Sequence, residues 1–330
     1  MAETRYDVIG IGNALVDVLV SVEDRFLEGE SLPKGGMVLV EADQSDALYA
    51  KLGPSTERSG GSCGNTMAGL AALGGRGAYI GKVRDDAFGQ VFRHDLSALG
   101  VAFETAPSAD ADPTGKCLVL VSPDAQRTMV TYLGAANALT AADIEKAAIE
   151  AAKVTYLEGY LFDRDDAKRA FIKAADLAHA AGREVSLTLS DGFCVDRHRE
   201  AFRALVEDHV DILFANEDEI KSLYQAESFD AALQQVRGHC KIACLTRSEK
   251  GSVILSGDEV HVVDAEPVDK LVDTTGAGDL YAAGFLFGYT QGYDLAKAGR
   301  IASIAAAEVV SHYGARPDAD LKALVAERLG

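Results

Sequence analysis

The chain has 330 residues, of which 48% are hydrophobic and 25% charged, and these proportions are ordinary for a soluble globular protein. Its net charge of −19 argues against binding to nucleic acid or to an anionic membrane, because both need a basic surface. No apolar run is long enough to span a bilayer, and five cysteines without a preceding signal segment predict reduced thiols and a cytoplasmic protein.

Short apolar runs alternate with amphipathic segments along most of the chain. Strands are predicted at residues 7–12, 77–83, 154–157, 184–189, 210–215 and 241–246. Helices are predicted at residues 65–73, 86–99, 141–152, 165–181, 196–206, 229–236, 276–291, 295–313 and 318–329. This alternation predicts an α/β fold with a doubly wound, mainly parallel sheet that carries helices on both faces.

A second set of strands interrupts this order in the first half of the chain. These strands are predicted at about 17–22, 36–42, 114–122 and 127–134. We expect them to form a small antiparallel sheet inserted into a single domain that covers residues 1–330. Such a sheet would make a natural lid over a ligand site. Its exposed edge could pair with the lid of a second chain or stay unpaired, so the protein is expected to be a monomer or a homodimer.

The first strand ends in a polar turn. Gly10 and Gly12 resemble the start of a dinucleotide fingerprint, but the third glycine is replaced by Leu15 and a strand follows instead of a helix. A dinucleotide-dependent oxidoreductase is therefore disfavoured. Asn13 and Asp17 remain at a strand end, where their paired hydrogen-bond groups suit sugar hydroxyls. A plain polar turn is the alternative.

Three later segments place polar groups after glycines or strand ends. Residues 60–65 (Gly-Gly-Ser-Cys-Gly-Asn) precede a helix of small residues and let a ligand approach the backbone, or form a simple turn with an asparagine cap. Asn216 and Glu219 either cap a helix or hold water bound to Mg²⁺. Residues 246–251 either line a nucleotide or turn the chain. Arg127 either reaches a phosphate from the lid or is a surface charge.

Residues 273–279 read Asp-Thr-Thr-Gly-Ala-Gly-Asp and lead into a long apolar helix. Backbone N–H groups that converge at a helix start, together with about half a positive charge from the helix dipole, form an anion site. An acid at the mouth of that site, Asp279, is suited to accept a proton from a hydroxyl that attacks a phosphoryl group. A simple helix cap is the alternative for this segment considered alone.

The four motifs are more specific together than apart. Gly12-Asn13 with Asp17, Gly60-Gly61 with Asn65, Asn216 with Glu219, and residues 273–279 resemble the ribokinase-like (pfkB) carbohydrate kinases in order and spacing. The resemblance covers essentially the whole chain. Within the family, residues 10–17, 113–117, 134–137 and 273–285 resemble the adenosine kinases.

The resemblance implies an ATP-dependent kinase that transfers the γ-phosphate to a primary hydroxyl, the 5′-OH of adenosine, to give AMP in purine salvage. It implies that Asp279 is the general base and that Arg127 approaches the phosphates from the lid. The anion hole would be formed by the N–H groups of Gly276, Ala277, Gly278 and Asp279. The residues expected at the acceptor are Asn13, Asp17, Gly60, Gly61, Asn65, Tyr160 and Phe193.

The same resemblance implies the positions of ATP and of the metal ions. The residues expected to contact ATP are Asn216, Thr246, Gly251, Thr275, Gly278 and Ser303. Glu219 would organise Mg²⁺ through water, and Asp273, Thr275 and Gly314 fall in the region where related kinases bind K⁺.

The acceptor stays open between two kinds of molecule. Adenosine kinases clamp the purine between aromatic rings, and here Tyr160 or Leu161 meets the first position and Phe193 the second. A pfkB-type sugar kinase acting on ribose, fructose or a related sugar is the alternative enzyme. A non-catalytic nucleoside- or sugar-binding protein is disfavoured, because binding alone does not need Asp279 or Glu219.

Overall fold

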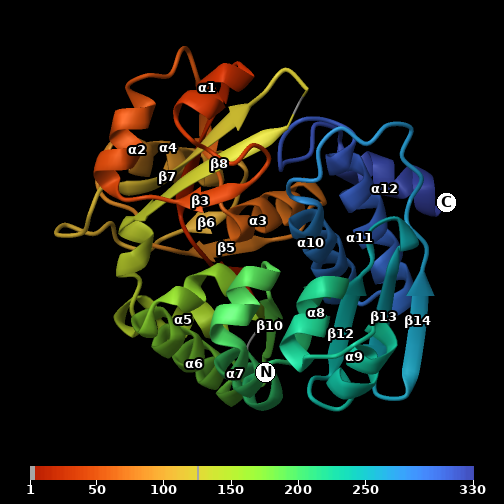
Figure 1. Ribbon diagram of the computed structural model, residues 1–330. Coiled ribbons are helices and arrows are strands. Elements are labelled where there is room, and N and C mark those ends of the chain that lie inside the picture. The colour runs from red at the N-terminus through yellow and green to blue at the C-terminus, as the bar shows by residue number, and fades with distance from the viewer. Residues whose placement is uncertain (1–3, 125) are drawn as a thin grey trace.

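The computed structural model describes residues 4–124 and 126–330, and its helices and strands largely follow the predicted order (Figure 1). The strands are β1 (Tyr6–Ile11), β2 (Leu15–Ser21), β3 (Met37–Leu39), β4 (Thr56–Ser59), β5 (Gly77–Ile80), β6 (Ala102–Phe103), β7 (Thr114–Val121), β8 (Arg127–Gly134), β9 (Ala152–Glu158), β10 (Glu184–Thr188), β11 (Ile212–Asn216), β12 (Ile242–Thr246), β13 (Ser252–Ser256) and β14 (Glu259–Val263). The helices are α1 (Asp24–Gly29), α2 (Ala42–Tyr49), α3 (Ser62–Ala72), α4 (Ala87–Ala98), α5 (Lys146–Glu150), α6 (Asp165–Ala180), α7 (Gly192–His209), α8 (Glu217–Tyr224), α9 (Phe229–Val236), α10 (Ala277–Thr290), α11 (Leu295–Val310) and α12 (Leu321–Leu329).

The larger sheet has nine strands in the order β14-β13-β12-β11-β10-β9-β1-β5-β6. Its pairs are parallel from β6 to β12, and β13 and β14 add two antiparallel pairs at one edge. The prediction of a mainly parallel sheet is confirmed. Strands β4, β6, β13 and β14 were not predicted, because each is short or lies in a stretch without clear alternation.

Side chains of the large sheet alternate between two apolar cores. Ile9 and Leu157 point to the core that α5, α6, α7, α8 and α9 cover. Val8 and Tyr156, each one residue away, point to the core under α3, α4, α10 and α11. Successive side chains of a strand point to opposite faces of the sheet, which explains this alternation. Because both faces are buried, the sequence of each strand is a continuous apolar run.

The smaller sheet has five strands in the order β3-β8-β7-β2-β4. A second sheet was predicted and is present, but its pairing is mixed instead of purely antiparallel. Strands β7–β8 and β2–β4 pair antiparallel, whereas β2–β7 and β3–β8 pair parallel. The partners in each parallel pair are distant in sequence, so no hairpin signal reports their direction. Helices α1 and α2 cover its outer face through Leu27 and Leu48.

Helices α1, α2 and α8 were not predicted, and the helices that were predicted differ from the structure mainly at their ends. The helix expected at 141–152 is only α5, preceded by a 3-10 turn at Ala141–Asp143, and α7 begins at Gly192 instead of 196. No helix within the described ranges has both the length and the apolar character needed to cross a membrane. All five cysteines lie in the described ranges and are free thiols.

Candidate active site

Helices α3 and α10 pack side by side over the interior strand β1 of the large sheet, and their first turns meet at the candidate site (Figure 1). Close packing depends on small residues, because a Cβ at Gly69 would lie 2.5 Å from Leu280 Cδ1 and 2.9 Å from Ala283 Cβ. The sequence therefore brings two helix N-termini together although more than 200 residues separate them.

Asp279 is held by two side chains from the start of α3. Ser62 Oγ donates to Asp279 Oδ1 at 2.6 Å, and Asn65 Nδ2 donates to Oδ2 at 3.0 Å. Burial raises the pKa of Asp279 to about 6, while these two hydrogen bonds act in the opposite direction and nearby Asp17 adds to the rise. The carboxylate is thus ionised near neutral pH and more basic than an ordinary aspartate.

The segment before α10 leaves backbone donors free at the helix start. Gly276 has a φ of 80° and caps the helix, and a Cβ there would lie 2.7 Å from Ala315 Cα. Within the described residues, the N–H groups of Gly276, Gly278 and Asp279 donate to no protein group. Ala277 departs from the predicted anion hole, because its N–H donates to Thr274 O at 3.2 Å and closes a turn. Three of the four predicted donors therefore have no protein acceptor among the described residues.

The predicted acceptor residues also converge. A Cβ at Gly60 would lie 2.2 Å from the Asp17 carboxylate, and a Cβ at Gly61 would lie 2.4 Å from Asn13 O. Gly61 has a φ of 80°, which favours glycine, and its backbone lies too close to Asn13 for any side chain to fit. Burial raises the pKa of Asp17 to about 6, with Arg316, Arg58 and Arg127 acting to lower it.

Glu158 is a buried acid at this site that sequence reasoning missed. Its Oε1 accepts from Asn13 Nδ2 at 2.8 Å, and its Oε2 accepts from Cys63 N at 2.8 Å. Burial raises its pKa to about 7, although both hydrogen bonds lower it. The available signal was its position directly after the apolar run 154–157, the same strand-end signal that identified Asn13.

Arg127 reaches the anion-hole segment from the small sheet. Its Nη2 lies 2.9 Å from Asp273 Oδ2, and both side chains are more than nine-tenths buried. Within the described residues, its Nε and Nη2 have no acceptor in hydrogen-bond geometry. Asp273 also accepts from Thr275 N and from Gly314 N, at 3.0 Å each. The predicted cation-site residues are therefore together, but a guanidinium already balances the charge of Asp273.

The two aromatic candidates lie just after neighbouring strands, Tyr160 in a 3-10 turn after β9 and Phe193 in the first turn of α7 after β10. Tyr160 OH donates to Ser190 O at 3.3 Å, and Tyr160 N donates to Ser190 Oγ at 3.2 Å. Ser190 has a φ of 73°, an uncommon conformation for a serine that often marks a functional loop. Phe193 is 80% exposed. Leu161 is buried in the core, which leaves Tyr160 as the partly exposed ring of the pair.

Asn216 and Glu219 form the capping arrangement that was one of two predicted alternatives. Asn216 Oδ1 accepts from Glu219 N at 2.8 Å, and Glu219 Oε2 accepts from Asn216 N at 2.9 Å. Burial raises the pKa of Glu219 to about 7. In the described part of the chain, no group of three His, Cys, Asp or Glu side chains is placed to hold a metal ion directly.

The three other predicted ATP residues border the segment that follows β14. A Cβ at Gly251 would lie 2.1 Å from Val263 O, and Thr246 ends the neighbouring strand β12. Ser303 accepts from Glu266 N at 2.8 Å and donates to Asp264 O at 3.0 Å. Both hydrogen-bonding functions of the buried Ser303 hydroxyl are thus used to fix this segment, which leaves the hydroxyl no proton to donate to a ligand.

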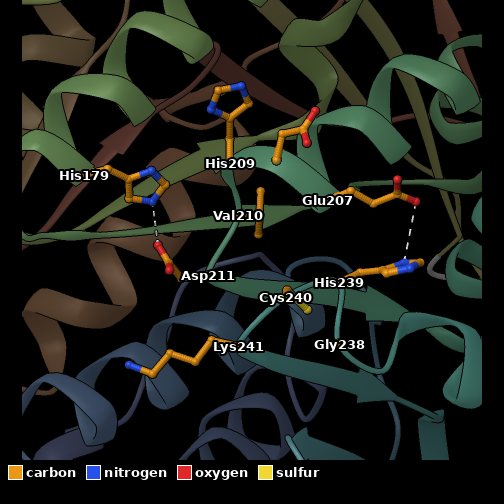
Figure 2. A pocket seen from close by; sticks show the side chains of 10 residues that line it. His179, Glu207, His209, Val210, Asp211, Gly238, His239, Cys240 and Lys241 are labelled. Carbon is orange, nitrogen blue, oxygen red and sulfur yellow. Dashed lines mark hydrogen bonds and ion pairs between the residues drawn. The ribbon is translucent and has the colours of Figure 1, made fainter.

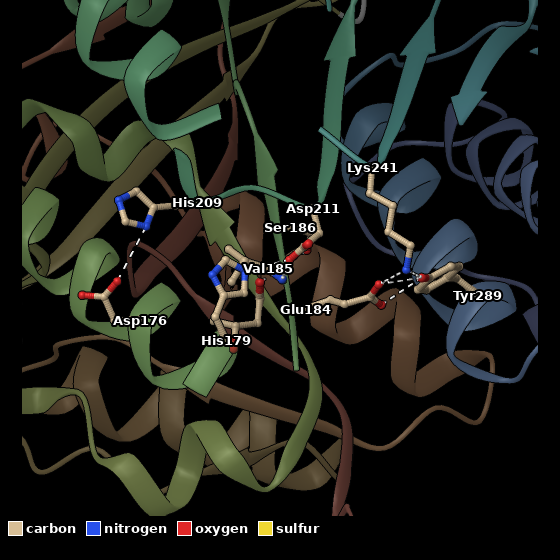
Figure 3. Close-up of polar contacts among 10 residues, drawn as sticks. Asp176, His179, Glu184, Val185, Ser186, His209, Asp211, Lys241 and Tyr289 are labelled. Atoms are coloured by element: carbon tan, nitrogen blue, oxygen red, sulfur yellow. Dashed lines mark hydrogen bonds and ion pairs between the residues drawn. The ribbon is translucent and has the colours of Figure 1, made fainter. Parts of the chain in front are cut away.

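A separate surface cavity of about 370 Å³ lies near the amino ends of β11 and β12, away from these residues (Figure 2). His179, His209 and His239 line it, and Figure 3 shows His179 paired with Asp211 at 2.9 Å and His209 with Asp176 at 3.7 Å. His239 lies 3.6 Å from Glu207 (Figure 2). Because each imidazole faces its own carboxylate instead of a shared point, the cavity carries none of the predicted chemistry.

The chain is similar to known proteins over nearly its whole length. The model of the pfkB family of carbohydrate kinases matches residues 40–322. The chain is 30% identical to adenosine kinase of Saccharomyces cerevisiae over 87% of this chain and 90% of that protein. Two solved structures are similar with TM-scores of 0.92. One is adenosine kinase from Sinorhizobium meliloti, which is 48% identical, with 99% of this chain and 100% of that chain covered. The other is a probable sugar kinase protein from Rhizobium etli CFN 42, which is 46% identical, with 98% of this chain and 99% of that chain covered.

Proposed function

The chain belongs to the pfkB family of carbohydrate kinases, and on that basis we propose that it transfers the γ-phosphate of ATP to the 5′-OH of adenosine, giving AMP. It is a phosphotransferase with an alcohol group as acceptor. The contact of Asp279 with Ser62 and Asn65, beside three free backbone donors, carries this proposal. A held base and an anion site at one point are what a hydroxyl attack on a phosphoryl group requires.

Asp279 would accept the proton of the attacking hydroxyl. Two donors fix its carboxylate, and its raised pKa gives it more affinity for a proton at the moment of attack. The N–H groups of Gly276, Gly278 and Asp279 would stabilise the charge on the transferred group. Arg127 supports the same role: its buried Nε has no acceptor among the described residues, and its Nη2 pairs with Asp273 without hydrogen-bond geometry, so the guanidinium can still donate to a phosphate.

Asn13 and Asp17 would bind the hydroxyls of the acceptor sugar. Glu158 holds the Asn13 amide, and the Asp17 carboxylate packs against Gly60 with no side chain between them. Carboxylate and amide groups at fixed positions suit vicinal hydroxyls, which both donate and accept. These groups alone fit the ribose of a nucleoside and a free sugar equally well.

The aromatic side chains favour a nucleoside over a free sugar. An 80% exposed phenylalanine beside a strained loop is unfavourable in water, and stacking on a purine would cover it. Tyr160 is fixed by its two contacts with Ser190, so it would give the second surface of the purine site. A free sugar offers no flat apolar face of this kind.

ATP and Mg²⁺ follow from the kinase family. Because no three-ligand metal group is present among the described residues, we expect Mg²⁺ to be held mainly by the phosphates and by water, with Glu219 beside it. Bound there, the ion would neutralise negative charge on the phosphates. K⁺ fits less well, because Arg127 already pairs with Asp273, and no step of the proposed reaction depends on K⁺. Assays in K⁺ and in Na⁺ would measure any dependence.

An acceptor panel tests the proposal. The purified protein is assayed with MgATP and adenosine, guanosine, inosine, ribose or fructose, and we expect efficient phosphorylation of dilute adenosine. Phe193→Ala should raise KM for adenosine by about tenfold, from the loss of about 1–1.5 kcal/mol of stacking. Val262→Ala, at an exposed residue of β14, serves as the control. Phosphorylation of ribose or fructose without adenosine would instead identify a sugar kinase.

A further inference from the structure

Arg316 lies in the loop after α11, beside the anion-hole segment, and the sequence analysis gave it no role. The preceding residue, Ala315, packs directly against Gly276, since a Cβ at Gly276 would lie 2.7 Å from Ala315 Cα. The loop that carries Arg316 is therefore in contact with the start of α10.

Arg316 contacts α3, the helix whose side chains hydrogen-bond to the proposed base Asp279. Its Nη2 donates to Ser59 Oγ at 2.9 Å, and its Nε lies 3.5 Å from Asn65 Oδ1, a long hydrogen bond. The Asn65 amide has an acceptor at one end and a donor at the other. A guanidinium at its oxygen therefore selects the orientation in which Nδ2 faces Asp279 Oδ2, at 3.0 Å. The reversed amide would place two oxygens against each other.

Arg316 also faces the second acid of the site, Asp17. The other groups around Asp17 are Arg58 on β4, Arg127 on β8, Cys117 on β7 and Asp279 on α10. Among the cations, Arg316 is the strongest influence that lowers the pKa of Asp17, ahead of Arg58 and Arg127. Arg58 sits opposite Asp17 in the β2–β4 pair but has no hydrogen bond to Asn65 among the described contacts.

We propose that Arg316 is a positioning residue for Asp279 and Asp17: it orients the Asn65 amide toward Asp279 and adds positive charge near Asp17. This inference rests on the proposed phosphoryl transfer but not on adenosine as the acceptor. A purely structural alternative is that Arg316 only ties the loop to Ser59 at the edge of the small sheet. The two roles differ in their effect on pH dependence.

The test compares Arg316→Gln, Arg316→Lys and Arg58→Gln in the full-length protein, with the acceptor that the wild type turns over best. For R316Q we expect a 10- to 100-fold lower kcat at pH 8, because Asn65 is no longer oriented. We also expect the acid limb of kcat/KM for the acceptor to move up by about one pH unit, because Asp17 loses the cation that most lowers its pKa.

The two comparison variants separate these effects. R316K keeps the charge, so its acid limb should stay near that of the wild type while kcat falls. R58Q should move the acid limb upward with little change in kcat at pH 8. If R316Q is poorly folded, R316K and R58Q still give this contrast.

Two results would overturn the inference. One is an R316Q or R316K enzyme with wild-type kcat and an unmoved acid limb. The other is an equal loss of activity at every pH that merely follows a lower melting temperature. A wild-type protein that phosphorylates a sugar but not adenosine would refute the nucleoside assignment and leave this test intact, whereas a wild type that transfers phosphate to no acceptor would refute both.

Discussion

At the scale of single residues, the site is defined by the proposed base. Replacing Asp279 with Asn keeps the shape and removes the proton acceptor, so we expect kcat to fall by about two to four orders of magnitude. Single-turnover measurement with saturating MgATP and acceptor tests this. Asp318→Asn, at an exposed acid of the same C-terminal region, is the control. Near-normal turnover in D279N would remove Asp279 from this role.

The second residue-scale prediction concerns two acids with similar titration. Asp17 and Asp279 both have a pKa raised to about 6, and both must be ionised, one to bind the acceptor and one to take its proton. As pH falls through about 6, both become protonated. The slope of log kcat/KM against pH should therefore approach two well below pH 6. Asp17→Asn should reduce the slope to one and raise KM for the acceptor, and an unchanged slope would contradict the pairing.

Glu158 gives a prediction about stability. Its pKa of about 7 in the folded protein exceeds the ordinary value of 4.5, so its ionisation is less favourable in the folded state. It therefore destabilises the fold progressively as pH rises from about 4.5 to 7, by roughly 3 kcal/mol in total. Glu158→Gln cannot ionise.

The measurement for Glu158 is the difference in melting temperature between variant and wild type at pH 5 and pH 8. Relative to the wild type, the Glu158→Gln variant should have a higher melting temperature at pH 8 than at pH 5. This holds whether the variant is more or less stable than the wild type at pH 5. The exposed Glu200→Gln on α7 should show no such shift. A difference that does not change with pH would mean that Glu158 titrates normally.

At the scale of elements, the start of α10 is the most constrained. Gly276 has a positive φ and touches Ala315, so Gly276→Ala should cost about 1–3 kcal/mol of stability and displace the free N–H groups. We expect a lower melting temperature together with a lower kcat. Gly278→Ala is the matched comparison for stability, since a Cβ there meets nothing within 4 Å and should leave the melting temperature unchanged.

The element scale also separates what the sequence could predict from what it could not. Strands such as β1 and β11 were predicted because each is a buried apolar run with a turn at its end. The parallel pairing of β2 with β7 could not be, because it joins segments about 100 residues apart and depends on the fold between them. Asp279 and Asn13 carried motif signals and Glu158 carried an unused strand-end signal, whereas Arg316 gains its meaning only from its neighbours in the fold.

At the scale of the whole molecule, the net charge of −19 opposes the approach of anionic ATP. Adding salt shortens the screening length from about 30 Å at 0.01 M to about 10 Å at 0.1 M and weakens that repulsion. We therefore expect KM for MgATP to fall as NaCl rises over this range, while KM for uncharged adenosine stays constant. An increase in KM for MgATP would mean that the local arginines dominate the field.

The distance in sequence between Asp279 and its partners has a consequence for synthesis. Ser62 and Asn65 precede Asp279 by 217 and 214 residues. At roughly 5–20 residues per second, they leave the ribosome about 10–40 s before the base does. During that interval the residues proposed to bind the acceptor have been synthesised but Asp279 has not. The face of α3 that packs against α10 in the folded protein then has no partner. If Asp279 is the base, as proposed, we expect a nascent chain to gain activity in one late step, when α10 docks onto α3.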